Sequence, residues 1–131
     1  RRELVPAQII ASTAKRTRTT AKRLARALDE EPPIVTDERL YQNGPEQCIR
    51  VLAEQGQGDI VLLIGHNPTM EELVRDLTGR YIALPTATVA IVRLPLECWG
   101  ELNPGSHGRF EGVISPHEAS GADDVGHADA W

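Results

Sequence analysis

The chain has 131 residues, two cysteines and a formal net charge of −5 at pH 7. This length suits a single domain that buries a hydrophobic core without disulfide bonds or a structural metal. No apolar run reaches the length of a membrane span, and we find no signal-peptide pattern. The cysteines, Cys48 and Cys98, form no close-spaced pair. This argues against a metal knuckle or a redox motif and predicts free thiols in a reducing cytoplasm.

Charge is unevenly spread along the sequence. Residues 1–26 carry eight lysines or arginines and one acid, whereas the remainder of the chain is strongly acidic. A local basic region in an acidic protein favours a small anionic ligand over a long nucleic acid, and no aromatic residue interleaves the basic ones. The alternative interpretation is that most of these cations form the solvated face of a helix.

The first half of the sequence alternates strand and helix patterns. Residues 7–12 predict an apolar strand, and residues 14–28 place small or apolar side chains at helical spacing, with Ser12 or Thr13 as the cap. Two prolines end that helix, and residues 33–37 predict a brief strand. Residues 43–58 predict a second helix with Pro45 at its first position and glycines at its end.

The second half continues this alternation. Residues 59–65 are a continuous apolar run, which is typical of a central parallel strand covered on both faces. Residues 68–79 predict a helix that ends at Gly79, residues 86–94 a β-branched strand, and residues 110–114 a last strand. We therefore expect an α/β domain over residues 1–115, a three-layer sandwich with a mainly parallel sheet flanked by helices. Residues 116–131 predict an acidic, flexible tail.

Unusual polar residues lie at two points where a predicted strand passes into a helix. One is the stretch Ser12 to Arg16, and the other is Gly65 to Pro68. Ligands of parallel sheets collect beyond the carboxyl ends of the strands, and the free N–H groups at a helix start favour an anion. The two junctions therefore predict an oxyanion site at one edge of the sheet.

Several residues at these junctions suit a phosphoryl group. The guanidinium of Arg16 can bind two phosphate oxygens, and a protonated His66 can donate to a third. Asn67 can bind the phosphoryl group, hold the loop or cap the helix, and Gly65 lets the backbone pass close to the ligand. The alternative for His66 is a structural histidine that is hydrogen-bonded at a helix start.

The motifs around these residues resemble those of the histidine phosphatase superfamily, and most of all its branch of phosphohistidine phosphatases called SixA. The stretch "IIASTAKRTRTTA" is similar to the Ser-x-x-x-Arg-x-x-x-Thr-Ala pattern of that branch, and "GHNP" is similar to a second family element. In this sequence the first pattern comprises Ser12, Arg16, Thr20 and Ala21. The resemblance covers roughly residues 5–115 and implies a phosphoglycerate mutase-like fold.

The family's defining Arg-His-Gly or Arg-His-Ala motif, whose histidine is the nucleophile, is absent from this sequence. We therefore expect the fold to lack its first strand here, with exposed edges on the neighbouring strands and the nucleophile upstream of residue 1. The resemblance implies that this upstream histidine attacks phosphorus while Arg16 and His66 stabilise the transferring oxygens, and that water then hydrolyses the phosphohistidine intermediate. No metal or cofactor is expected, because His107, His117 and His127 fit no ligand pattern.

The resemblance also bears on the substrate. Many relatives place a carboxylate after the second crossover to protonate the leaving group, whereas here Arg39 takes that position and Glu38 is the candidate acid. A missing strong acid suits imidazole, whose reference pKa is ~6.5, and so favours phosphohistidine in a phosphorylated protein. Two alternatives stay open: a non-catalytic relative that binds phosphate or phosphopeptides, and a phosphomonoesterase that acts on a small phosphorylated substrate. We expect no nucleic-acid or membrane partner, and the sequence does not define the oligomeric state.

Overall fold

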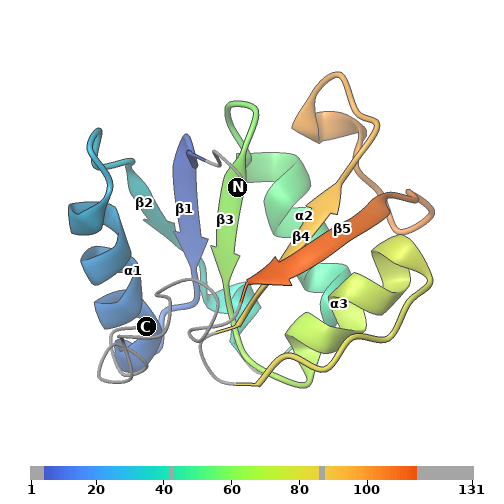
Figure 1. Cartoon of the computed structure of the whole chain (residues 1–131), viewed down its shortest axis with the longest axis horizontal. Coiled ribbons are helices and arrows are strands. Elements are labelled where there is room, and N and C mark those ends of the chain that lie inside the picture. The colour runs from blue at the N-terminus through green and yellow to red at the C-terminus, as the bar shows by residue number, and fades with distance from the viewer. Residues whose placement is uncertain (1–4, 42, 86–87, 115–131) are drawn as a thin grey trace.

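Three parallel strands form the main sheet (Figure 1). They are β1 (Gln8–Ala11), β2 (Ile34–Thr36) and β3 (Val61–Ile64), in the spatial order β2-β1-β3. Each strand coincides with an apolar segment predicted from the sequence, and their parallel pairing confirms the α/β class. The computed structural model describes residues 5–41, 43–85 and 88–114.

Helices cover both faces of this sheet (Figure 1). Helix α1 (Lys15–Ala27) packs on the face that carries Ile9 of β1. Helices α2 (Pro45–Gln55) and α3 (Thr69–Thr78) pack on the opposite face, where Ile10 joins their hydrophobic cluster. Because consecutive strand residues point to opposite faces, these two isoleucines supply both layers of packing. The predicted three-layer sandwich is confirmed.

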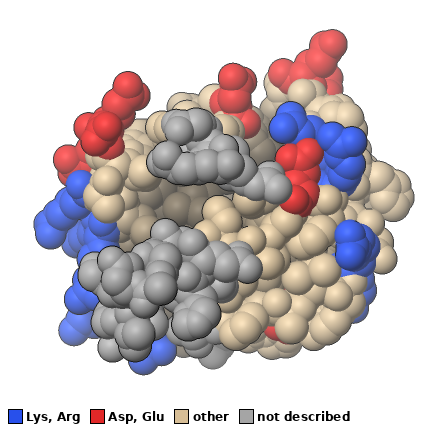
Figure 2. All heavy atoms as spheres, in the orientation of Figure 1, with Lys and Arg blue, Asp and Glu red and all other residues tan. Residues whose placement is uncertain are grey.

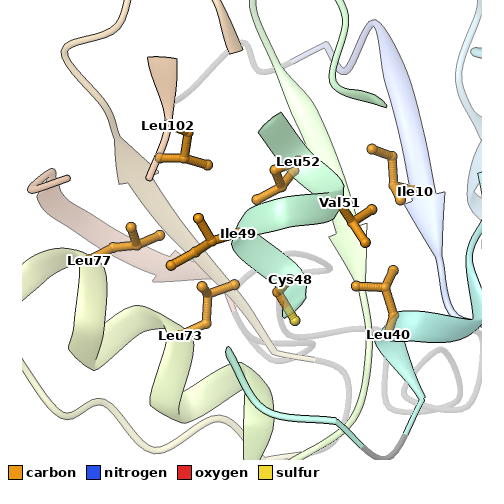
Figure 3. Close-up of a cluster of buried hydrophobic side chains, with 9 residues drawn as sticks. All are labelled: Ile10, Leu40, Cys48, Ile49, Val51, Leu52, Leu73, Leu77 and Leu102. Carbon is orange, nitrogen blue, oxygen red and sulfur yellow. The ribbon is translucent and has the colours of Figure 1, made fainter. Parts of the chain in front are cut away.

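The larger hydrophobic cluster is built around α2 and includes two short 3₁₀ segments, η1 (Glu38–Leu40) and η2 (Trp99–Glu101). Figure 3 shows its buried side chains, which are Ile10, Leu40, Cys48, Ile49, Val51, Leu52, Leu73, Leu77 and Leu102. Burial raises the pKa of the Cys48 thiol to about 11, so this thiol is protonated at neutral pH and behaves as a small apolar side chain.

Strands β4 (Val89–Arg93) and β5 (Arg109–Ile114) form a separate antiparallel pair, with an irregularity between Ile91 and Val92. Val92 packs against the larger cluster, and both strands contact α3. The predicted strand over residues 86–94 is confirmed from residue 89 onward. Residues 86–87 and the predicted tail over residues 116–131 lie outside the described part of the chain.

One edge of β3 and one edge of β4 have no strand partner among the described residues. Among the described residues, β3 pairs only with β1, and β4 pairs only with β5. From left to right in Figure 1, the pair formed by β4 and β5 comes after β3. All four residues of β3 are half-buried, whereas all four residues of β1 are buried. The predicted cover on both faces is confirmed, because Leu62 and Ile64 pack against the cluster under α1 while Val61 and Leu63 pack against the larger cluster. The predicted central position is wrong for the described residues, in which β3 has a neighbouring strand on one flank only.

No helix in the described ranges is long and apolar enough to cross a membrane. Both cysteines are free, as predicted, and the structure places Cys48 in the core and Cys98 at the surface. The three parallel strands direct their carboxyl ends to one edge of the sheet, and both of the predicted strand-to-helix junctions begin at that edge.

Candidate active site

The two predicted junctions are in direct contact at the carboxyl edge of the sheet. The backbone N–H of Ser12 donates to the carbonyl oxygen of Ile64 over 3.1 Å, so the pairing of β1 with β3 continues past the end of β1. The Oγ of Ser12 lies 2.8 Å from Nε2 of His66, although the two residues are 54 positions apart in the sequence. This hydrogen bond joins the segment that leads into α1 to the segment that leads into α3.

Ser12 has a fully buried side chain with a second partner. Its Oγ accepts the N–H of Ala14 over 3.3 Å, and Ala14 is the N-cap residue of α1. An alanine side chain cannot accept a hydrogen bond, so α1 begins without a side-chain cap. The prediction that Ser12 or Thr13 caps the helix is therefore wrong, because the Ser12 hydroxyl bonds to the residue before the helix and to the histidine.

His66 is held by its backbone and by a neighbouring aromatic ring. Its carbonyl oxygen accepts the N–H of Met70, which attaches the residue to α3. The imidazole centroid lies 5.1 Å from the ring centroid of Tyr41, and the two planes are tilted by 58°. Tyr41 was not among the site residues predicted from the sequence. No local spacing signals this contact, since only the tertiary fold brings the end of η1 beside the histidine.

Arg16 lies in the first turn of α1 and its side chain is exposed. It makes no hydrogen bond or ion pair with any residue that the structure describes. The first turn of α1 contains no acidic residue, and Figure 2 shows Lys and Arg side chains gathered over this helix. The helix start therefore offers, close in sequence to Ser12, a cation that has no partner in the described part of the chain. The convergence of Arg16 and His66 on one oxyanion stays a prediction.

Asn67 has partners on both sides of its amide group. Its Nδ2 donates to the carbonyl oxygen of Leu84 over 2.6 Å, and its Oδ1 accepts the N–H of Glu71 over 3.2 Å. The side chain thus holds a loop and the first turn of α3, and its predicted contact with a phosphoryl group stays a prediction. Gly65 makes room for packing, since a Cβ there would lie 2.8 Å from the Cε of Met70.

The carboxylate that follows β2 is fixed by its neighbours. Asp37 accepts hydrogen bonds from the backbone N–H and the guanidinium of Arg39, and from Gln55. The side-chain hydrogen bond from Arg39 holds the pKa of Asp37 below its ordinary value, so this carboxyl is ionised at neutral pH. Arg39 also pairs with Glu54 at 2.9 Å. Glu38 is exposed. No contact in the described structure tests its role as the candidate acid, so this role stays a prediction.

Other polar groups lie away from these junctions. A hollow of about 360 Å³ beside the start of α2 is lined in part by Glu46 and Asp76, whose negative charge does not suit an oxyanion. His107 lines a different hollow, and His117 and His127 lie outside the described residues. Within the described ranges, no three or more His, Cys, Asp or Glu side chains gather in a way that could hold a metal ion.

Comparison with known proteins finds similarity at the level of structure. No family model matches the sequence, and no curated protein matches it significantly. The structure is similar to that of an Agrobacterium tumefaciens protein assigned as the phosphohistidine phosphatase SixA. The TM-score is 0.66 and the identity 26%, over 86% of this chain and 69% of that chain. A Nakamurella multipartitia protein with the same assignment has a TM-score of 0.71 and 21% identity, over 86% of this chain and 73% of that chain.

The sheet order, the flanking helices and these structural similarities define the phosphoglycerate mutase-like fold. The similarity to the Agrobacterium structure, at 26% identity, agrees with the sequence motifs in supporting the histidine phosphatase superfamily and its SixA-like branch. The resemblance drawn from the sequence is therefore confirmed.

Proposed function

We propose that this chain forms the phosphate-binding part of a phosphatase that removes the phosphoryl group from phosphohistidine in a phosphorylated protein. The observation that carries the proposal is the contact between Ser12 and His66, which joins two helix starts into one anion site. Arg16 in the first turn of α1 supplies the positive charge. The similarity to the Agrobacterium SixA structure supports the substrate class.

The nucleophile in this proposal is a histidine that lies outside the 131-residue sequence. It belongs to a strand inserted between β3 and β4, each of which has one edge without a strand partner in the described ranges. Edge strands carry unpaired N–H and C=O groups that an added strand can bond. The half-buried apolar side chains of β3 and β4 support the same insertion, because a new neighbour would cover them further. A strand parallel to β3 would bring its carboxyl end to the edge where His66 lies.

The proposed reaction has two steps. First, a ring nitrogen of the nucleophilic histidine bonds to phosphorus while the P–N bond of the substrate breaks, and the departing imidazole takes up a proton. Arg16 and His66 stabilise negative charge on the transferring oxygens. Second, water displaces the enzyme histidine, which releases inorganic phosphate and restores the nucleophile. The proposal involves no metal or cofactor.

The acids near the site support imidazole as the leaving group. An alkoxide needs a proton donor when it departs, whereas imidazole has a reference pKa of ~6.5 and departs more easily. Asp37 is ionised and paired with Arg39, so it has no proton to donate at neutral pH. Glu38, which precedes Arg39 in η1, therefore stays the candidate proton donor to the leaving group that the sequence predicts.

A second candidate function is the binding of phosphate or of a phosphopeptide without turnover. The absence of an Arg-His-Gly or Arg-His-Ala motif from the 131 residues favours this function for the chain acting alone. Both candidates use the same anion site and differ only in whether a nucleophile is present. For both candidate functions we propose a location in the cytoplasm, which the two free cysteines support.

Turnover by two forms of the protein tests the proposal: the 131-residue chain, and the same chain with the upstream residues of its reading frame. We expect the longer form to hydrolyse phosphohistidine in preference to para-nitrophenyl phosphate, and the shorter form to bind tungstate without turnover. His66→Gln should lower turnover by the longer form, whereas the control His107→Gln should not. A preference for small phosphomonoesters would favour a phosphomonoesterase instead, and binding without turnover by the longer form would favour the second candidate.

A further inference from the structure

The hydroxyl hydrogen of Ser12 has one acceptor among the described residues. Ser12 is 0% exposed, and its Oγ contacts the N–H of Ala14 and the Nε2 of His66. The N–H of Ala14 is a donor and cannot accept a hydrogen. If Nε2 also carried a hydrogen, the buried hydroxyl would have no acceptor, which is costly. The bond is therefore satisfied when Ser12 donates and Nε2 of a neutral imidazole accepts.

We infer that Ser12 is a positioning residue that fixes the tautomer of His66, with the hydrogen of the neutral ring on Nδ1. In histidine, the hydrogen bond made by one ring nitrogen sets the protonation of the other. Nε2 is committed to Ser12, and Nδ1 makes no hydrogen bond within the described ranges. The neutral ring thus presents an N–H donor on its Nδ1 side. The assignment of a phosphoryl oxygen as the acceptor rests on the proposed function.

This tautomer determines how a neutral imidazole meets an oxyanion. Phosphoryl oxygens of a dianion accept hydrogen bonds and do not donate them, so a lone pair on Nδ1 would repel them. With Ser12 as donor to Nε2, Nδ1 carries a hydrogen even when the ring is neutral. When His66 is protonated, Nδ1 still donates, although the Ser12 hydroxyl hydrogen then has no acceptor among the described residues, which is costly. The site therefore offers the oxyanion a donor in both protonation states of the histidine.

NMR spectroscopy of the 131-residue chain, labelled with ¹⁵N in its histidine rings, tests the inference. The spectra are recorded at about pH 8.5, roughly two units above the reference histidine pKa of ~6.5, so that the nitrogen signals of neutral rings can distinguish the two tautomers. His66→Gln identifies the signals of His66 by their disappearance. We expect the wild-type ring to carry its hydrogen on Nδ1. A hydrogen on Nε2 would overturn the inference without any further variant.

Two substitutions at Ser12 separate positioning from folding. Ser12→Ala removes the donor and should leave His66 as a mixture of tautomers, with tungstate affinity at the same pH reduced about tenfold, as expected for one hydrogen bond to a charged group. Ser12→Thr keeps the hydroxyl and should restore the single tautomer, and the His107 signals should be unchanged in both variants. A folded Ser12→Ala protein with an unchanged His66 tautomer would overturn the inference. Failure of the wild-type chain to bind tungstate would instead refute the proposed function, since the tautomer is measured without a ligand.

Discussion

Replacement of Arg16 by alanine should weaken the binding of phosphate or tungstate to the chain by about tenfold. Hydrogen bonds to charged groups contribute about 1.5–3 kcal/mol, and the exposed position of Arg16 places it at the low end because water and salt screen the charge. A loss of about 1.4 kcal/mol corresponds to a tenfold change in dissociation constant. Because Arg16 has no partner among the described residues, the substitution should leave the free energy of unfolding unchanged.

Titration calorimetry measures the affinity of each variant for phosphate or tungstate, and Arg18→Ala is the matched control. Arg18 is also exposed and lies on the same helix, but its side chain leaves the axis about 200° away, at 100° per residue. Both variants remove one charge from α1, and only Arg16→Ala should lose the contact with the anion. Arg16→Lys should fall between wild type and alanine, because a lysine cannot bind two oxygens in a fork. Equal loss in Arg16→Ala and Arg18→Ala would show that the general field of the helix attracts the anion, and would refute the assignment of Arg16.

Two further predictions concern stability. Gly58 has a φ of +80°, and a Cβ there would lie 2.5 Å from the Cβ of Ala7, so Gly58→Ala should lower the free energy of unfolding by about 2 kcal/mol or more in urea denaturation. The control Gly100→Ala, where a Cβ meets nothing within 4 Å, should change it by less than about 0.5 kcal/mol, and equal losses would contradict the argument. Asp37→Asn should be less stable than wild type at neutral pH, since the variant loses one of the two charged partners of Arg39. The folded-state pKa of Asp37 is lowered, so its contribution is present above the unfolded-state pKa and is lost as pH falls through the lower folded-state value. The difference between the two proteins should therefore shrink below about pH 4, and a difference independent of pH would contradict the role of this carboxylate.

Features of the fold that depend on local chemistry were predictable from the sequence. In α3, the spacing of Leu73, Val74 and Leu77 marks one buried face, and these three residues are buried in the structure. Gly79 was expected to end the helix, and it does so as a left-handed C-cap with φ of 77°. Pro45 likewise occupies the start of α2. In each case the residue acts on its own turn of the chain, so no knowledge of distant neighbours is needed.

Features that depend on distant neighbours were not predictable in the same way. The apolar run of β3 predicts burial, but how far it is covered depends on the strands beside it. Ser12 and His66 were singled out separately as residues at helix starts, and their contact follows from the register of β1 and β3. Tyr41 was not predicted as a site residue, because its ring meets the histidine through tertiary structure. Asp37 was not predicted as a site residue, since its partners Arg39 and Gln55 come from two other elements.

The segment that ends at Leu84 is hydrogen-bonded to the start of α3 through both the N–H and the carbonyl oxygen of Leu84. The Leu84 N–H donates to Glu71 over 2.7 Å, and its carbonyl oxygen accepts from Asn67. The Tyr81 hydroxyl donates to the same Glu71 carboxylate over 3.0 Å. Opening of this segment alone would break all three bonds at once, so the amide hydrogen of Leu84 should exchange with solvent no faster than those in the first turn of α3. The helix start that carries His66 and the segment beside it are thereby expected to fluctuate as one cooperative unit.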